Sequence, residues 1–187
     1  ASFLSKSNSK NLKIFLAAHE EEIRHTNTDK SNYFFRKCSK FFSDYYRQNI
    51  TVTTPFKKIT KTELISYWKN HWIKKYKILP YETITCYYGN YCGSCNACIK
   101  RSIAFLASNL RLDPLIKENP MRDKSKYLYN DLRFRFDKFP RKRKLELLIA
   151  ISKSWKDLPT NVKKWYNTIN PHLIESSLKY EKRLRRL

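Results

Sequence analysis

The sequence predicts two modules: an α/β module closed by a cysteine-rich loop over residues 1–112, and an all-α module of three helices over 124–187. The first module contains two short strand-like runs and, between them, a stretch with mixed helical spacing. Four cysteines then lie within thirteen residues. Beyond residue 124 the apolar residues keep a helical spacing. Prolines and charges over residues 113–123 favour a linker between the modules.

The elements of the first module follow from hydrophobic spacing. Residues 12–18 form a short apolar run, which is typical of a buried strand. Residues 50–56 are β-branched and alternating, and they predict a second strand. Residues 28–48 carry aromatic and basic side chains at mixed helical spacing. A helix is expected to begin at Thr60, because Thr60 and Glu63 have the spacing of a capping box.

The second module is predicted to hold helices over 127–136, 144–158 and 161–170. Pro171 is expected to stop or kink the third helix, because proline lacks the amide that a helix interior needs. The basic residues of 182–187 predict a tail that lies on phosphates, with a solvated helix end as the alternative.

The charge of the chain is strongly unbalanced. Lys and Arg total 39 against 16 Asp and Glu, which gives a net charge of +23. The excess extends over both modules, so a local solvated charge run does not explain it. Such a surface favours a polyanion, because each phosphate contact releases counterions. We expect nucleic acid as the partner, DNA more than RNA, or the protein chains of a nucleoprotein assembly.

Composition also excludes some classes of protein. The two glycines, Gly89 and Gly93, both lie in the cysteine cluster, so this chain has no glycine-rich phosphate loop. A bilayer span needs about 20 apolar residues, and no such run occurs, so no membrane partner is expected. Residues 1–15 lack the pattern of a secretory signal. We therefore expect a reducing compartment inside a cell: the nucleus, a virion or viral factory, or an organelle.

The cysteine spacing C-x5-C-x2-C-x2-C predicts a metal site. Thiolates on a tight loop can supply a tetrahedral zinc ion with four ligands, and a four-cysteine site leaves no open position for a water nucleophile. We predict one structural Zn²⁺, with an iron–sulfur cluster as the alternative. A helix is expected over 98–109, and Cys38 is expected to be a buried free thiol. The predicted ligands are Cys86, Cys92, Cys95 and Cys98.

Several stretches of the first module resemble one enzyme family in sequence and order. They are 15–19 (FLAAH), 54–56 (TPF), 60–65 (TKTELI), 80–87 (PYETITCY), 92–101 (CGSCNACIKR) and 104–105 (AF). Together they resemble the C-terminal part, with the zinc region, of 7-cyano-7-deazaguanine synthase, over about residues 12–110. The resemblance implies an adenine nucleotide alpha hydrolase-like domain, a zinc site, and a family activity that uses ATP to make a nitrile on a deazapurine.

The chain departs from that family at two points. The family carries a pyrophosphatase-type glycine loop near its N-terminus, which this chain lacks. It also carries a Tyr-Pro-Asp-Cys-Arg segment, of which only Asp29 and then Phe34 fit here, so the substrate-contacting Cys and Arg are replaced. We therefore predict a degenerate α/β remnant reused as a scaffold. The alternative is a C-terminal part or subunit of a synthase whose ATP-binding half lies on another polypeptide.

The chain over about residues 120–170 resembles an HMG box. Pro120, Arg122 and 127–129 (YLY) fit its opening, and residues 146–166 fit its second helix and the start of its third. The resemblance implies a minor-groove DNA binder that wedges Leu128 between base steps and bends the duplex. Pro171 departs from the long third helix of that family. The predicted nucleic-acid contacts are Arg122, Lys124, Lys126, Tyr127, Leu128, Arg133, Arg135, Lys156 and Lys163.

The function predicted from the sequence is non-enzymatic, and no catalytic residue is assigned. We expect a zinc-stabilised protein that binds or bends DNA or sits in a nucleoprotein assembly. One alternative is part of an ATP-dependent 7-cyano-7-deazaguanine synthase. Another is a structural subunit of a viral, transcription or ribosomal particle. The Lys-, Asn-, Ile- and Tyr-rich composition indicates an AT-rich genome, such as that of a large DNA virus or an organelle.

Overall fold

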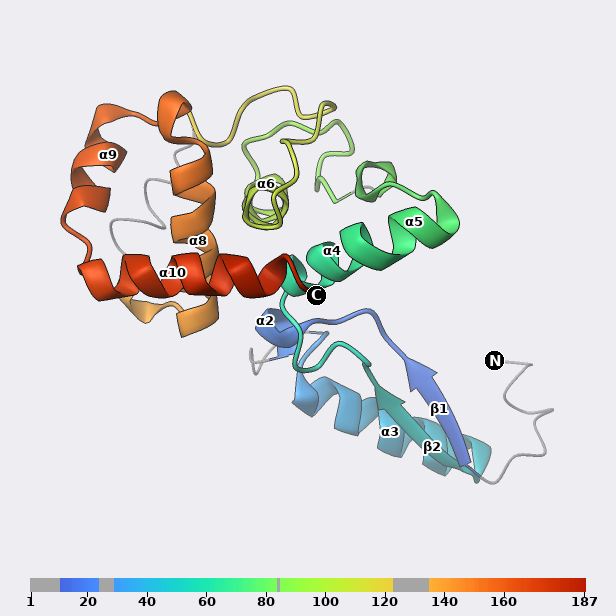
Figure 1. Ribbon diagram of the computed structural model, residues 1–187. Helices are drawn as coiled ribbons and strands as arrows, with labels where there is room; N and C mark the ends of the chain where they lie inside the picture. The colour runs from blue at the N-terminus through green and yellow to red at the C-terminus, as the bar shows by residue number, and fades with distance from the viewer. Residues whose placement is uncertain (1–10, 24–28, 84, 123–134) are drawn as a thin grey trace. The chain divides into compact units, whose positions relative to one another are not determined.

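The structure is a computed structural model (Figure 1). It describes residues 11–23, 29–83, 85–122 and 135–187. Its internal contacts divide the chain into two compact units, residues 1–61 and 62–187. This division does not coincide with the module boundary expected at 113–123. Among the described residues, none of the helices combines the length and apolar character that crossing a membrane requires.

The first unit contains a two-stranded parallel sheet. Strand β1 (Asn11–Phe15) pairs with β2 (Asn49–Thr53), and Asn11 lies opposite Asn49. Parallel strands need a crossover connection, and helices α2 (Glu20–Ile23) and α3 (Asn32–Tyr46) lie within it (Figure 1). Both predicted strands are confirmed, although each ends a few residues before its predicted limit.

Helix α3 is held to β2 by two serine side chains. The backbone amide of Val52 donates to the hydroxyl of Ser39 at 2.8 Å, and the amide of Ile50 donates to the hydroxyl of Ser43 at 2.9 Å. Ser31 caps the start of the helix, because its hydroxyl accepts from the amide of Phe34 at 3.1 Å. The helical segment predicted within 28–48 is thus confirmed.

A small apolar core lies between the sheet and α3. Cys38 packs partly buried against this core as a free thiol, so the prediction of a free cysteine is confirmed but its burial is only partial. The fully buried members of the core are Ala18, Ile23, Phe35 and Val52.

The second unit is helical in its described residues. The expected helix at Thr60 is α4 (Lys61–Tyr67), which runs through a π-helical turn into α5 (Ile73–Tyr76). Further along the chain come α6 (Asn96–Ala107), α8 (Arg141–Lys153), α9 (Thr160–Asn167) and α10 (Pro171–Leu184). Short 3-10 turns cover Pro80–Glu82, Phe136–Lys138 and Trp155–Asp157.

Helix α8 is the central helix of this unit. Every residue from 145 to 151 is buried, which is the pattern of a helix with packing partners on all sides. Helix α6 packs on α8 through Ile99 and Ile103, and α10 packs on it through Leu184. The α6 helix, which contains Cys98 and is capped by Cys95, therefore shares a core with the C-terminal helices.

Two predictions about the C-terminal region meet different outcomes. The third predicted helix, α9, ends at Asn167 and so before Pro171, which instead is the first residue of α10, where the side chain of Asn170 accepts from the amide of His172 at 2.9 Å. The basic residues predicted as a tail lie at the end of α10, which continues to the buried Leu184, so this end of the chain is helical as far as residue 184 and its contact with phosphates stays a prediction. The helix expected over 127–136 lies almost entirely outside the described residues, so the HMG-box arrangement stays a prediction.

Candidate metal centre

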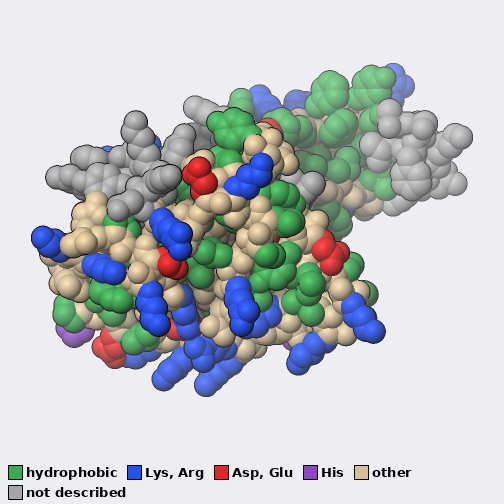
Figure 2. Space-filling view, turned by 90° about the horizontal axis from the view of Figure 1, so that it is seen from above, with side chains coloured by type: hydrophobic (Ala, Val, Ile, Leu, Met, Phe, Trp, Pro, Cys, Tyr) green, Lys and Arg blue, Asp and Glu red, His purple; other side chains and the backbone are tan. Residues whose placement is uncertain are grey.

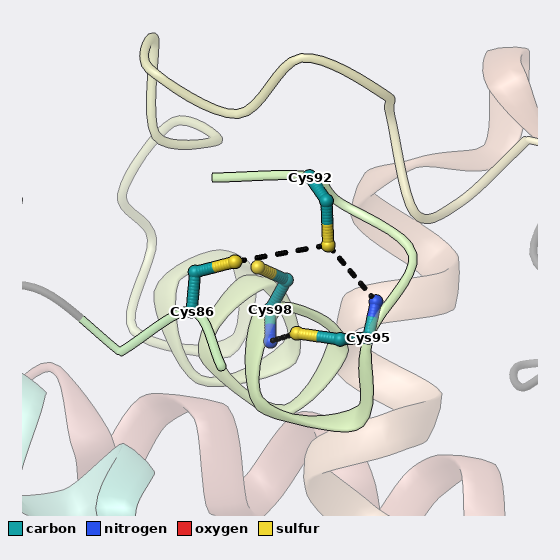
Figure 3. Close-up of side chains that lie close together, drawn as sticks. All are labelled: Cys86, Cys92, Cys95 and Cys98. Atoms are coloured by element: carbon teal, nitrogen blue, oxygen red, sulfur yellow. Dashed lines mark hydrogen bonds between the residues drawn. The ribbon is translucent and has the colours of Figure 1, made fainter. Parts of the chain in front are cut away.

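Four cysteine side chains converge at the start of α6 (Figure 3). Two come from the loop that precedes the helix, one caps the helix, and one lies in its first turn. Their sulfur atoms all lie within 4.8 Å of one another. The structure thus brings together all four predicted metal ligands, which are Cys86, Cys92, Cys95 and Cys98.

The spacing of the sulfur atoms suits tetrahedral coordination. With metal–sulfur bonds of about 2.3 Å, the edges of a tetrahedron are about 3.8 Å long. The Sγ atoms of Cys86 and Cys92 are 3.7 Å apart. The amide of Cys95 lies 3.4 Å from Sγ of Cys92, and the amide of Cys98 lies 3.4 Å from Sγ of Cys95. These amides stabilise negative charge on the sulfur atoms, so the loop is prepared for thiolates.

The negative charge that the four sulfur atoms can carry favours a bound cation. Hydrogen bonding from the backbone of Cys92 lowers the pKa of Cys86 to about 6. Burial raises the pKa of Cys98 above its usual value, and the neighbouring sulfur groups of Cys95 and Cys86 add to this effect. Four thiolates this close repel one another, so they can all ionise only around a positive ion. The donor set therefore fits a divalent metal ion.

The two glycines in the loop have different surroundings. Both have a positive φ, +70° at Gly89 and +82° at Gly93. A Cβ atom on Gly89 would meet nothing within 4 Å, whereas one on Gly93 would collide with the backbone carbonyl of Glu118. The amide of Lys117 also donates to the carbonyl of Tyr91 at 2.9 Å. The segment expected to be a linker therefore packs directly against the cysteine loop.

A buried ion pair supports the loop, and the sequence reasoning missed it. Arg101 follows Cys98 by one turn of α6, and its side chain is paired with Asp113. Asp113 lies in the segment interpreted as a linker because of its prolines and charges. The sequence carries no local signal for such a pair, because its two members are joined only by the folded chain.

The predicted nucleic-acid contacts are placed in part. Lys156 is exposed in the Trp155–Asp157 turn, where Arg122 forms an ion pair of 3.6 Å with Asp157. The Nζ atom of Lys163 lies 5.9 Å from the ring centroid of Trp155. Three of the predicted residues thus gather around this turn, while Arg135 is exposed before the Phe136–Lys138 turn. The predicted contacts outside the described residues are Lys124, Lys126, Tyr127, Leu128 and Arg133.

A second cationic cluster, which includes the basic residues of 182–187, surrounds the end of α10. Burial lowers the pKa of Lys69, and the nearby charges of Arg185 and Lys153 lower it further. Lys182 and Arg183 are exposed in the last turn of α10, and Arg185 and Arg186 are exposed directly after it. We call these six residues the α10 cationic cluster. Its sequence signal was present in the final basic residues, but Lys69 and Lys153 join it only through the fold.

Comparison with known proteins gives one match. A family sequence model with the description "Queuosine biosynthesis protein QueC" matches residues 1–109, which include the four cysteines. No curated protein and no solved structure matches the chain significantly.

Proposed function

The chain belongs to the family of the queuosine biosynthesis protein QueC, and we propose that it is a non-enzymatic member of that family, which holds a structural zinc ion and binds nucleic acid. The resemblance of the first module to 7-cyano-7-deazaguanine synthase is confirmed by the family match. Membership implies an α/β domain of the adenine nucleotide alpha hydrolase type. The nucleic-acid role is carried by the excess of positive charge, and above all by the α10 cationic cluster.

The metal is proposed to be zinc with a structural role. Four sulfur ligands complete a tetrahedron, so no position is left for a water or a substrate. The cluster joins the loop from Cys86 onward to the start of α6, which is packed in the core of the second unit. A bound ion would therefore fix the loop on the helical core.

The residues that replace the family's substrate-contacting pair support a non-enzymatic role. Lys30 and Ser31 follow Asp29, where the family segment has Cys and Arg. Lys30 donates to the carboxylate of Glu22 at 2.9 Å, and Ser31 is buried as the cap of α3. Both side chains thus stabilise local structure, and neither offers a thiol or a guanidinium to a deazapurine.

The charge distribution supports a polyanionic partner. Lys and Arg side chains are spread over the face drawn in Figure 2, and Asp and Glu side chains are few there. In the α10 cationic cluster, burial lowers the pKa of Lys69, and the nearby positive charges of Arg185 and Lys153 lower it further. Glu181 pairs with both Lys153 and Arg185, and Arg183 lies 3.9 Å from Glu63, so two carboxylates offset only part of this charge. A phosphate placed there would add negative charge next to the remaining cations.

The test is duplex DNA binding measured against salt concentration. We expect log K to fall steeply with log salt, and the triple variant Lys182→Gln/Arg183→Gln/Arg186→Gln to reduce the magnitude of that slope by up to about 3. The matched control is Lys13→Gln/Lys57→Gln, which removes exposed lysines from the first unit and should leave the slope nearly unchanged. Binding that is absent, or insensitive to salt, would overturn the nucleic-acid role.

A finer form of the proposal is HMG-box-like docking on DNA. The spacing of the sequence landmarks supports it, and Leu128 is the expected wedge. Leu128→Ala should then keep the salt dependence of binding but lose most of the DNA bending, measured by energy transfer between dyes at the duplex ends. Equal bending by the wild type and the variant would remove the HMG-box form and leave the general proposal standing.

A second candidate function is a part of a 7-cyano-7-deazaguanine synthase. The family match favours it, because it covers the α/β elements together with the cysteine loop. The chain would then act with a glycine-loop-bearing ATP half. Purification from the native source should recover such a polypeptide, and the mixture should form the deazapurine nitrile in the presence of ATP, detected by mass spectrometry. A nitrile product would overturn the non-enzymatic proposal.

A further inference from the structure

The outer face of α3 carries large aromatic side chains in contact with water. Tyr33, Phe34, Phe41 and Tyr45 are 55%, 36%, 62% and 71% exposed. The opposite face of the helix buries Phe35 in the core of the first unit. The four exposed rings are therefore not required for that core, and a cluster of this kind on one helix marks a binding surface.

The exposed rings are arranged along one stripe. Tyr33, Lys37, Phe41 and Tyr45 are spaced four residues apart, so they follow one another along the same side of the helix. The rings of Phe41 and Tyr45 are stacked, with centroids 6.1 Å apart and an angle of 16° between their planes. The ammonium group of Lys37 lies 5.4 Å from the ring centroid of Tyr33.

Positive charge is in excess on this face of α3. Asp44 is the acidic residue of α3, and it forms an ion pair with Lys40 at 2.8 Å. Arg36, Lys37 and Arg47 are exposed, and within the described part of the chain the structure gives them no ion pair. The stripe itself therefore combines aromatic rings with Lys37, while Arg36 precedes Lys37 in the helix and Arg47 caps its C-terminal end.

The rings and charges of this face favour one kind of ligand over another. A second copy of the chain would bring Arg36, Lys37 and Arg47 against the same three cations, which is unfavourable. Aromatic rings interleaved with cations are instead the combination that binds single-stranded nucleic acid, where bases stack on rings and phosphates meet Lys or Arg. A duplex hides its base faces inside the stack, so it cannot use these rings.

We propose that the outer face of α3 is a binding surface for single-stranded nucleic acid. Bases stack on Phe41 and Tyr45, and the phosphates of the same strand contact Arg36, Lys37 and Arg47. The inference rests on the proposed nucleic-acid function, and it adds a site in the first unit that differs in ligand from the α10 cationic cluster. From Tyr33 to Tyr45 the helix rises about 18 Å, so the stripe can contact a short single strand along its length.

The experiment measures the binding of full-length variants to a labelled oligouridylate by fluorescence anisotropy. The probe has about ten nucleotides, which lies within the range of site sizes of single-strand-binding domains. Tyr45→Ala should weaken binding about tenfold, which is within the range for loss of one base–aromatic stack. Tyr45→Trp should retain the affinity of the wild type, because tryptophan keeps an aromatic face. Tyr45→Leu should bind as weakly as Tyr45→Ala, because leucine is apolar but offers no ring. Phe15→Ala is the matched control, because Phe15 is 61% exposed but lies on β1.

The outcomes separate this inference from the broader proposal. Duplex binding that depends on the α10 cationic cluster, with oligouridylate binding unchanged in Tyr45→Ala, would overturn the α3 site and leave the nucleic-acid function intact. Equal binding by Tyr45→Leu and the wild type would also overturn it, because leucine offers no stacking face. A dimer in sedimentation that dissociates in Phe41→Ala would identify a second copy as the occupant and overturn the site. Absence of binding to either probe would overturn both proposals.

Discussion

Arg101 and Asp113 form a buried ion pair that joins the two ends of the metal-binding region. The Nε atom of Arg101 donates to the carboxylate of Asp113 at 2.9 Å, and the side chains are 3% and 0% exposed. The same guanidinium donates to the hydroxyl of Thr83 and to the carbonyl of Pro80, each at 2.8 Å, and it lies over the ring of Phe105. One side chain of α6 therefore holds the chain segments that enter and leave the cysteine loop.

Removal of the charge of Asp113 should destabilise the second unit strongly. Asp113→Asn leaves the buried guanidinium of Arg101 without its counter-charge, and a broken buried pair costs about 3–5 kcal/mol. Arg101→Lys should be nearly as damaging, because an ammonium group cannot replace the planar fork of the guanidinium. Urea unfolding monitored by circular dichroism measures both changes.

The exposed pair of Arg122 and Asp157 is the control for that prediction. It spans 3.6 Å, and its side chains are 68% and 43% exposed. Asp157→Asn should therefore change the free energy of unfolding by less than about 1 kcal/mol. An Asp113→Asn variant no less stable than Asp157→Asn would contradict the role given to the buried pair.

The two glycines should respond differently to the same substitution. Gly89→Ala should cost about 1 kcal/mol, because its only penalty is a positive φ in open space. Gly93→Ala has the same backbone penalty and also drives a methyl group into the carbonyl of Glu118. We expect Gly93→Ala to lower metal content and stability clearly more than Gly89→Ala. Elemental analysis together with thermal unfolding tests the difference, and equal behaviour of the two variants would refute the close packing.

Metal removal should lower stability without unfolding every helix. Chelation would release the loop, while α6, α8 and α10 keep their shared apolar core. Acid should act in the same direction, because protons compete with the metal for all four thiolates. Elemental analysis should give about one zinc per chain. Cys86→Ser should abolish binding, whereas Cys38→Ser, outside the cluster, should have no effect. Iron in the purified protein would rule out the zinc site.

Glu181 should make stability depend on pH in the acid range. It accepts from Lys153 at 2.8 Å and from Arg185 at 2.7 Å, and so connects α8 with α10. Burial raises its pKa, but these two cations outweigh that effect, and the pKa lies below its ordinary value of 4.5. The stabilisation is therefore complete above pH 4.5 and is lost as the pH falls through the lower folded value.

The variant Glu181→Gln isolates this effect. It should reduce the free energy of unfolding at neutral pH and flatten the profile of stability against pH below about 4.5. Glu175→Gln is the control, because Glu175 pairs with Lys179 on the exposed side of the same helix. Parallel profiles for the wild type and Glu181→Gln would show that the bridge contributes nothing.

The features predicted correctly from sequence are those set by nearby residues. The strand within 50–56, the helical segment within 28–48 and the convergence of the four cysteines each depend on spacing within a few turns of chain. The features that were missed depend on distant partners. In the sequence, Asp113 has the surroundings of a linker residue, and its ion pair with Arg101 is seen only in the folded chain. Lys69 has no distinguishing neighbours in the sequence, and Arg185 comes near it only through the fold.

The end of the chain illustrates the same limit. Its basic residues predict a tail, because local composition dominates the signal there. The burial of Leu184 depends instead on an apolar surface of α8, far away in sequence. Local spacing gives no information about such a surface, so α10 could be recognised only in the folded chain.

The serine contacts of α3 determine at which edge the small sheet could pair with a further strand. On the side of β2 that faces away from β1, the amides of Ile50 and Val52 already donate to Ser43 and Ser39. A new strand that approached from that side would have to break both bonds, so β2 is a protected edge. Any extension of the sheet, whether by another segment or another polypeptide, must therefore add next to β1.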